Sequence, residues 1–190
     1  MTHSRSRASD RILTVPNLLS FLRIALIPVF VWLIVDEDTT FAGLMLFSAV
    51  AATDWLDGTI ARATGQVSEL GKVLDPVADR LAIAAGLIAL VIRGAFPLWA
   101  ALLILVRDVA ILIAGLVLLR RNVKIEVRMV GKVATFALLL GIGAVSWGTL
   151  GYPLSAAALA IGWSCYAVGI VEYYAATALY VQDARRQLAA

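Results

Sequence analysis

Four aspartates, Asp54, Asp57, Asp75 and Asp79, lie within 26 residues of a chain that is otherwise strongly apolar. The chain is 62% hydrophobic and 15% charged, with a mean hydropathy of +0.91. Ionised carboxylates repel one another, and each is costly beside a membrane core unless a counter-charge or a metal ion compensates it. The cluster therefore predicts a divalent cation bound among the four carboxylates.

The spacing of the aspartates predicts two facing pairs. Asp54 and Asp57 are at i and i+3, and Asp75 and Asp79 are at i and i+4, so each pair shares one face of a helix. Two helices with a short connection are antiparallel neighbours, which brings the pairs together. Hard carboxylate oxygens suit Mg²⁺, Mn²⁺ or Ca²⁺ rather than zinc. The alternative is a set of interfacial charges at helix ends, paired with Arg62, Lys72 and Arg80.

Small residues accompany the carboxylates. Gly58 follows Asp57 directly, Ala61 is one turn further along, and Gly71 stands one turn before Asp75. A stripe of small side chains beside a metal ion lets a bulky ligand approach the backbone. Arg62, near the end of the same helix, is suited to hold a phosphate group.

The elements that must position these residues are long apolar segments. A charged fraction of 15% lies well below the quarter that is typical of soluble domains, so we predict an all-α integral membrane protein. A basic tail at 1–11 and a polar tail at 183–190 flank one six-helix domain at 12–182. The membrane-spanning helices are expected at about residues 17–35, 40–62, 71–92, 98–119, 127–148 and 154–181.

The charges on the loops predict the orientation. With six spans, only Arg93 of the 16 Lys and Arg residues falls in a loop on the side opposite the termini, where the acidic triplet 36–38 also lies. We therefore expect a multi-pass protein of the cell membrane, with both termini and a polar cavity around the aspartates on the cytoplasmic side. The net charge of +3 points to anionic lipid rather than to nucleic acid.

The motif resembles the signature of the CDP-alcohol phosphotransferase family, D-x2-D-G-x2-A-R-x8-G-x3-D-x3-D. The matching positions are Asp54, Asp57, Gly58, Ala61, Arg62, Gly71, Asp75 and Asp79. The resemblance implies transfer of a phosphatidyl-type group from a CDP-linked lipid to a hydroxyl, with release of CMP. It also implies a homodimer.

The resemblance further implies a role for each motif residue. The four aspartates would hold one or two Mg²⁺ or Mn²⁺ ions, and Asp79 would also act as general base. The CDP moiety would bind at Asp57, Gly58, Ala61, Arg62, Gly71 and Asp75.

The sequence indicates the acceptor alcohol less clearly than it indicates the family. Arg107-Asp108, the sequence 131–135 (GKVAT) and Tyr173-Tyr174 resemble the cardiolipin synthases of this family, whose acceptor is phosphatidylglycerol. The phosphatidylglycerol phosphate synthases, whose acceptor is glycerol 3-phosphate, are the alternative. In that branch a further arginine is expected at position 114, where this chain has Ala114.

Cations near the cytoplasmic side are the candidates for binding the phosphate of the acceptor. They are Arg23, Arg107, Arg128 and Lys132, with Asn17 as a polar neighbour. Arg128 and Lys132 could instead be simple positive-inside anchors. Arg107 could instead form a buried pair with Asp108 or Glu172, because intramembrane ions are usually paired or line a cavity.

A cation transporter is the alternative of another class, since buried aspartates can carry ions. All four carboxylates, however, gather near one face instead of spreading across the bilayer. The inverted repeat of many transporters is also not visible in the sequence. A lipid-binding scaffold would need neither the four carboxylates nor the arginine beside them.

Overall fold

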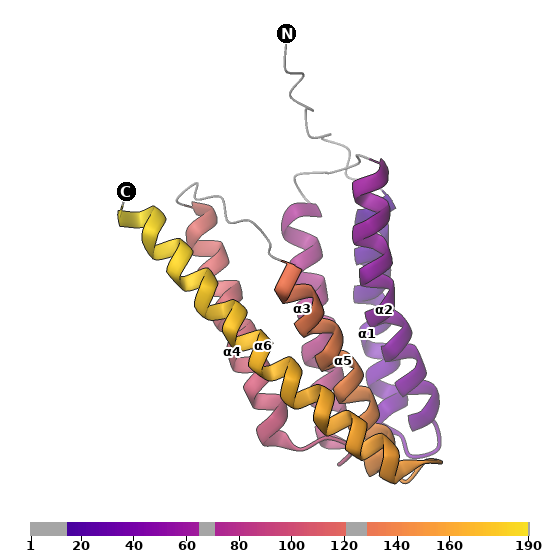
Figure 1. Cartoon of the computed structure of the whole chain (residues 1–190). Helices are drawn as coiled ribbons and strands as arrows, with labels where there is room; N and C mark the ends of the chain where they lie inside the picture. Colours follow the sequence, from indigo (N-terminus) through magenta and orange to yellow (C-terminus); the bar gives the residue numbers. More distant parts are fainter. Residues whose placement is uncertain (1–14, 65–70, 121–128, 190) are drawn as a thin grey trace. The chain divides into compact units, whose positions relative to one another are not determined.

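The computed structural model describes residues 15–64, 71–120 and 129–189, and side chains mainly within 18–52, 77–113 and 135–178. In these ranges the chain is helical apart from short turns (Figure 1). The helices are α1 (Val15–Val35), α2 (Thr40–Thr64), α3 (Gly71–Ile92), α4 (Leu98–Arg120), α5 (Met129–Thr149) and α6 (Ser155–Ala189).

The predicted all-α class and the order of the helices are confirmed. The observed bounds of α1 to α5 fall within about two residues of the expected ones, and α3 begins at Gly71 as predicted. The main difference is α6, which extends to Ala189, past the expected end at Val181. Hydropathy marks where a membrane span would end, whereas the polar residues that follow are still good helix formers. The C-terminal segment 183–189 is therefore helical.

The chain divides into two compact units, Met1–Ala89 and Leu90–Ala190. In the first unit, α1 packs along α2 (Figure 1). The two helices approach closely at Gly43, where an added Cβ would lie 2.5 Å from the Ile34 backbone nitrogen. The rings of Phe30 and Phe47 meet at 5.4 Å between centroids, and Gly86 of α3 leaves room for the Phe47 ring. Small residues thus set how tightly these helices pack.

The turn between α1 and α2 is held by threonine hydroxyls. Thr39 donates to the Asp36 carboxylate at 2.7 Å, and Thr40 donates to the Asp36 carbonyl at 2.8 Å. Thr39 also donates to the Leu33 carbonyl at 3.1 Å, in the last turn of α1, where carbonyls lack a partner within the helix. The acidic turn that the sequence predicts at 36–38 is therefore confirmed.

In the second unit, α5 and α6 pack with their backbones close together (Figure 1). The contact surface is what we call the glycine seam. At each of its positions an added Cβ would meet the facing helix at 2.9 Å or less. The seam consists of Gly141, Gly148, Gly162 and Gly169.

Larger side chains connect α4 to α6. The indole rings of Trp99 and Trp163 stack with 5.6 Å between centroids and 9° between planes. The Tyr166 ring packs edge-on against both indoles, and its hydroxyl donates to the Ala100 carbonyl at 2.8 Å. The aromatic contacts therefore fix one end of the α4–α6 pair.

Glycines with positive φ end two of the helices. At the end of α3, Gly94 has a φ of 72°, and Ala95 N–H donates to the Leu90 carbonyl at 2.8 Å. At the end of α5, Gly151 has a φ of 75°, and Tyr152 N–H donates to the Trp147 carbonyl. Both are Schellman caps, in which glycine avoids the steric cost of a Cβ in the left-handed region. Both caps lie in the gaps between the expected spans, at 93–97 and 149–153.

Two helices are long and apolar enough, by length and composition, to cross a membrane. They are Leu18–Val35 of α1 and Ser155–Ala178 of α6, and the shorter apolar stretches Thr40–Ala52 and Thr135–Thr149 lie in α2 and α5. Only 22% and 17% of the residues in the two long stretches are buried, which is not typical of the core helix of a soluble domain. This result covers the described parts of the chain only.

Candidate functional site

The aspartate motif lies on α2 and α3, as the sequence predicts. The backbone is helical at Asp54, Asp57, Asp75 and Asp79, so the i, i+3 and i, i+4 spacings do place each pair along one helix. The side chains of the other motif positions and of three of the aspartates lie outside the described part of the structure. These positions are Asp54, Asp57, Gly58, Ala61, Arg62, Gly71 and Asp75.

Asp79 is the motif aspartate whose side chain is described. It forms an ion pair with Arg23 of α1, through Oδ1 and Nη1. Arg23 is 6% exposed and Asp79 is 24% exposed, so the pair is largely shielded from solvent. The structure thus brings together the predicted general base and one of the cations predicted to bind the acceptor.

The donor set of the motif fits a hard divalent cation. Asp79 Oδ1 is buried and receives no hydrogen bond, and Arg23 is its ionic partner. Such an oxygen remains a strong acceptor that a cation can use. All four motif positions supply carboxylate oxygen, which is the ligand type that Mg²⁺ and Mn²⁺ prefer. Among the described side chains, no three metal-ligating residues gather, because Asp54, Asp57 and Asp75 are not among them.

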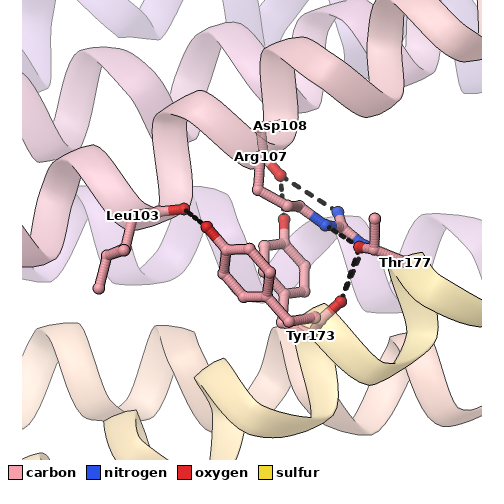
Figure 2. A network of polar contacts seen from close by, with 6 residues as sticks. Leu103, Arg107, Asp108, Tyr173 and Thr177 are labelled. Atoms are coloured by element: carbon pink, nitrogen blue, oxygen red, sulfur yellow. Dashed lines mark hydrogen bonds and ion pairs between the residues drawn. The ribbon is translucent and has the colours of Figure 1, made fainter.

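A second polar cluster lies between α4 and α6 (Figure 2). Arg107 and Asp108 are each 6% exposed. Arg107 donates from Nε to the Thr177 hydroxyl at 2.7 Å, from Nη1 to Asp108 Oδ1 at 3.3 Å, and from Nη2 to the Tyr173 carbonyl at 3.4 Å. The guanidinium also lies over the Tyr173 ring, 3.5 Å from its centroid. A buried cation is tolerated here because several partners share its charge.

Two further bonds complete this cluster. The Tyr173 hydroxyl donates to Asp108 Oδ1, and the Thr177 hydroxyl donates to the Tyr173 carbonyl at 2.8 Å. Nearby, the Tyr174 hydroxyl donates to the Leu103 carbonyl at 2.9 Å (Figure 2). Residues about 65 to 71 positions apart are therefore linked by polar contacts.

Arg107 pairs with one of its two predicted partners. The pair with Asp108 is present. The pair with Glu172 is not seen, since Glu172 Oε2 is buried without a hydrogen-bond partner in the described part of the chain. Of the two predicted partners of Arg107, Asp108 is therefore confirmed, and Glu172, which lies on α6 one residue before Tyr173, is not seen as a partner.

The structure describes less of the other residues that are predicted to bind the acceptor. Asn17 lies in the first turn of α1 and Lys132 in the first turn of α5, with side chains outside the description. Arg128 falls outside the described residues. Sequence reasoning missed Thr177 altogether and noted Tyr173 only for its resemblance. The available signal was the i, i+4 spacing of two hydroxyl side chains in an apolar helix.

Comparison with known proteins agrees with the family resemblance of the aspartate motif. A model of the CDP-alcohol phosphatidyltransferase family matches residues 13–171. A cardiolipin synthase (CMP-forming) from Streptomyces coelicolor is 36% identical over 186 residues, which cover 94% of this chain and 86% of the relative. A CDP-diacylglycerol–glycerol-3-phosphate 3-phosphatidyltransferase from Bacillus subtilis is 34% identical over 153 residues, which cover 73% of this chain and 79% of the relative.

Proposed function

The chain belongs to the CDP-alcohol phosphatidyltransferase family, and from this premise we propose that it is a cardiolipin synthase. As a member of this family it is an enzyme that transfers phosphatidyl groups. The proposed reaction moves a phosphatidyl group from CDP-diacylglycerol to a hydroxyl of phosphatidylglycerol, giving cardiolipin and CMP. The alternative acceptor is glycerol 3-phosphate, for which the relative from Bacillus subtilis is named.

The observation that carries the choice of acceptor is the extent of the likeness to the relative from Streptomyces coelicolor, which covers nearly the whole chain. The residues support the same choice. Arg107-Asp108 is followed by Ala114 instead of a further arginine. A lipid acceptor is already held by its acyl chains, so it needs fewer phosphate-binding cations than soluble glycerol 3-phosphate does.

We propose that Asp54, Asp57, Asp75 and Asp79 hold one or two Mg²⁺ or Mn²⁺ ions. The bound metal supplies positive charge that neutralises the pyrophosphate and stabilises CMP as the leaving group. Asp57 and Asp75 would also contribute to the nucleotide site. The small residues Gly58, Ala61 and Gly71 leave space for the cytidine, and Arg62 binds phosphate.

In the proposed chemical step, Asp79 accepts the proton of the acceptor hydroxyl. The hydroxyl oxygen bonds to the phosphorus next to the diacylglycerol, and the bond from that phosphorus to CMP breaks. An aspartate is a weak base for an alcohol, so its contribution depends on position. The ion pair with Arg23 holds the Asp79 carboxylate in a defined orientation. Arg23, Arg107, Arg128 and Lys132, together with Asn17, would attract the anionic acceptor.

We also propose that all six helices cross the membrane, with the aspartates in a cavity open to the cytoplasm. Large hydrophobic side chains are exposed on every helix, as expected for surfaces in contact with lipid. Examples are Trp32, Phe41, Ile88, Val106, Phe136 and Val171.

Cysteine labelling would test this topology. Cys165 is the single native cysteine, so it is first replaced by alanine. In intact cells, a membrane-impermeant maleimide should label Asp38→Cys but should label Asn122→Cys only after permeabilisation. The opposite pattern would place the aspartates on the outer face.

The acceptor is tested with purified protein in detergent or vesicles. CDP-diacylglycerol and Mg²⁺ or Mn²⁺ are supplied with either phosphatidylglycerol or glycerol 3-phosphate, and the lipid product is identified by mass. Cardiolipin from phosphatidylglycerol is the expected result. A product from glycerol 3-phosphate alone would assign the alternative function. Loss of the product with EDTA and its return with added metal would support the metal site.

We further propose that the enzyme is a homodimer, as the resemblance to the family implies. Chemical cross-linking in native membranes should give a species of twice the 20.3 kDa chain mass. Recovery of the single chain alone, at all cross-linker concentrations, would contradict the dimer.

A further inference from the structure

The hydrogen-bonding capacity of Arg107 is only partly used. A guanidinium has five N–H groups, and three of them donate to Thr177, Asp108 and Tyr173 in the described structure. Only the bond to Thr177 is short; the other two, at 3.3 and 3.4 Å, are beyond the usual range. One N–H on each terminal nitrogen of this buried side chain has no described partner. Arg107 can therefore still donate to an additional anion.

The Arg107–Asp108 pair shares its carboxylate oxygen with a second donor. Asp108 Oδ1 accepts the Tyr173 hydroxyl as well as Arg107 Nη1. The carboxylate therefore divides its negative charge between two donors. A close, bidentate pair, as arginine and carboxylate commonly form, does not develop here.

Tyr173 contacts both charged groups at once. Its hydroxyl bonds to Asp108, its carbonyl accepts from Arg107, and its ring lies under the guanidinium. Thr177 adds to the arrangement, because its hydroxyl donates to the Tyr173 carbonyl while it accepts from Arg107 Nε. One residue of α6 thus contacts both neighbouring charged groups of α4 (Figure 2).

We propose that Tyr173 is a positioning residue for the acceptor. By donating to Asp108 it prevents a tight Arg107–Asp108 pair, and so keeps two N–H groups of Arg107 available for the phosphodiester of phosphatidylglycerol. Its hydroxyl also offsets the negative charge of Asp108, which would otherwise repel the acceptor. This inference rests on the proposed function, because it requires an anionic lipid acceptor.

Two neighbouring tyrosines provide a matched experiment. Tyr173→Phe and Tyr174→Phe each remove one hydroxyl that joins α6 to α4, but Tyr174 donates to the Leu103 carbonyl and not to Asp108. Steady-state kinetics are measured for the full chain at varied phosphatidylglycerol. Tyr173→Phe should raise the KM for phosphatidylglycerol about 10- to 100-fold, the effect of one hydrogen bond to a charged group. Its kcat and its KM for CDP-diacylglycerol should change less than about 2-fold. Tyr174→Phe should leave all three within about 2-fold of wild type.

Equal effects of the two substitutions would overturn the proposal, and so would a Tyr173→Phe defect in kcat alone or in both KM values. Asp108→Asn alone gives a second test, which can be measured whether or not Tyr173→Phe folds. Removing the competing carboxylate should lower the KM for phosphatidylglycerol, and adding Tyr173→Phe to Asp108→Asn should then have little effect on it. A raised KM in Asp108→Asn would contradict the competition. Failure of the wild type to make cardiolipin would refute the proposed function, and it is seen before any variant is compared.

Discussion

Each compact unit buries an arginine beside an aspartate in its described part, and the two pairs are built differently. In the first unit, the Arg23–Asp79 pair joins two helices that are distant in sequence. In the second, Arg107 and Asp108 are adjacent on α4, and the connection to α6 comes from Tyr173 and Thr177. The first carboxylate therefore depends on its arginine, whereas the second also has a phenol donor. The difference predicts that substitutions of Arg23 or Asp79 have larger effects than substitutions of Arg107 or Asp108.

The largest expected effect is on kcat, and it distinguishes Asp79 from Asp108. Asp79→Asn should lower kcat at least about 100-fold, because loss of general acid–base catalysis commonly costs 10²- to 10⁴-fold. Asp108→Asn should retain measurable turnover, since Asp108 is not proposed to touch the reacting atoms. Initial rates of cardiolipin formation measure both.

Asp38→Asn is the matched control for this experiment. Asp38 is an exposed carboxylate in the turn between α1 and α2, so its substitution should leave the rate unchanged. Full activity in Asp79→Asn would show that Asp79 is not the general base.

The second effect concerns stability and compares the two arginines. Arg23→Met leaves the Asp79 carboxylate without its cation and should cost about 3 kcal/mol or more in the free energy of unfolding. Arg107→Met should cost about 1–3 kcal/mol, because Asp108 keeps the Tyr173 hydroxyl and the Tyr173 carbonyl keeps the Thr177 hydroxyl. Unfolding of each variant in mixed detergent micelles gives the two values. A larger loss for Arg107→Met would reverse the comparison.

The smallest effect addresses the helix packing of the second unit. At Gly162 an added Cβ would lie 2.6 Å from the Val145 backbone nitrogen, so Gly162→Ala should destabilise by about 1–3 kcal/mol. At Gly143, on the facing helix, an added Cβ meets nothing within 4 Å. Gly143→Ala should therefore be neutral or stabilise by up to about 1 kcal/mol through helix propensity. Thermal unfolding compares them, and equal melting temperatures would mean that the seam does not limit packing.

The positions of the helices could be read from the sequence with good accuracy. Long apolar segments indicated the order and most of the bounds, and α3 and α5 end at Gly94 and Gly151, because a glycine in the left-handed region is a strong local stop. The motif spacing likewise placed Asp54, Asp57, Asp75 and Asp79 on two helices. These features depend on residues that are near one another in the chain.

The partners of the charged groups were harder to predict. Arg23 and Asp79 were both selected, but not as a pair, since the spacing along the chain carries no information about which helix faces lie together. Arg107 was assigned Asp108 or Glu172, while Thr177 and Tyr173 supply the other contacts. Hydroxyl and carbonyl groups give no charge pattern, so their role becomes visible only when α6 is packed against α4.

With the proposed topology, the glycine seam has a consequence for how the chain enters a membrane. A Gly-capped turn of a few residues connects α5 and α6. At each glycine of the seam the facing helix comes close, because no side chain stands between them. Two such helices can associate before any other partner is present. We therefore expect α5 and α6 to insert as a single hairpin during synthesis, and a chain truncated before α6 to leave α5 poorly retained in the bilayer.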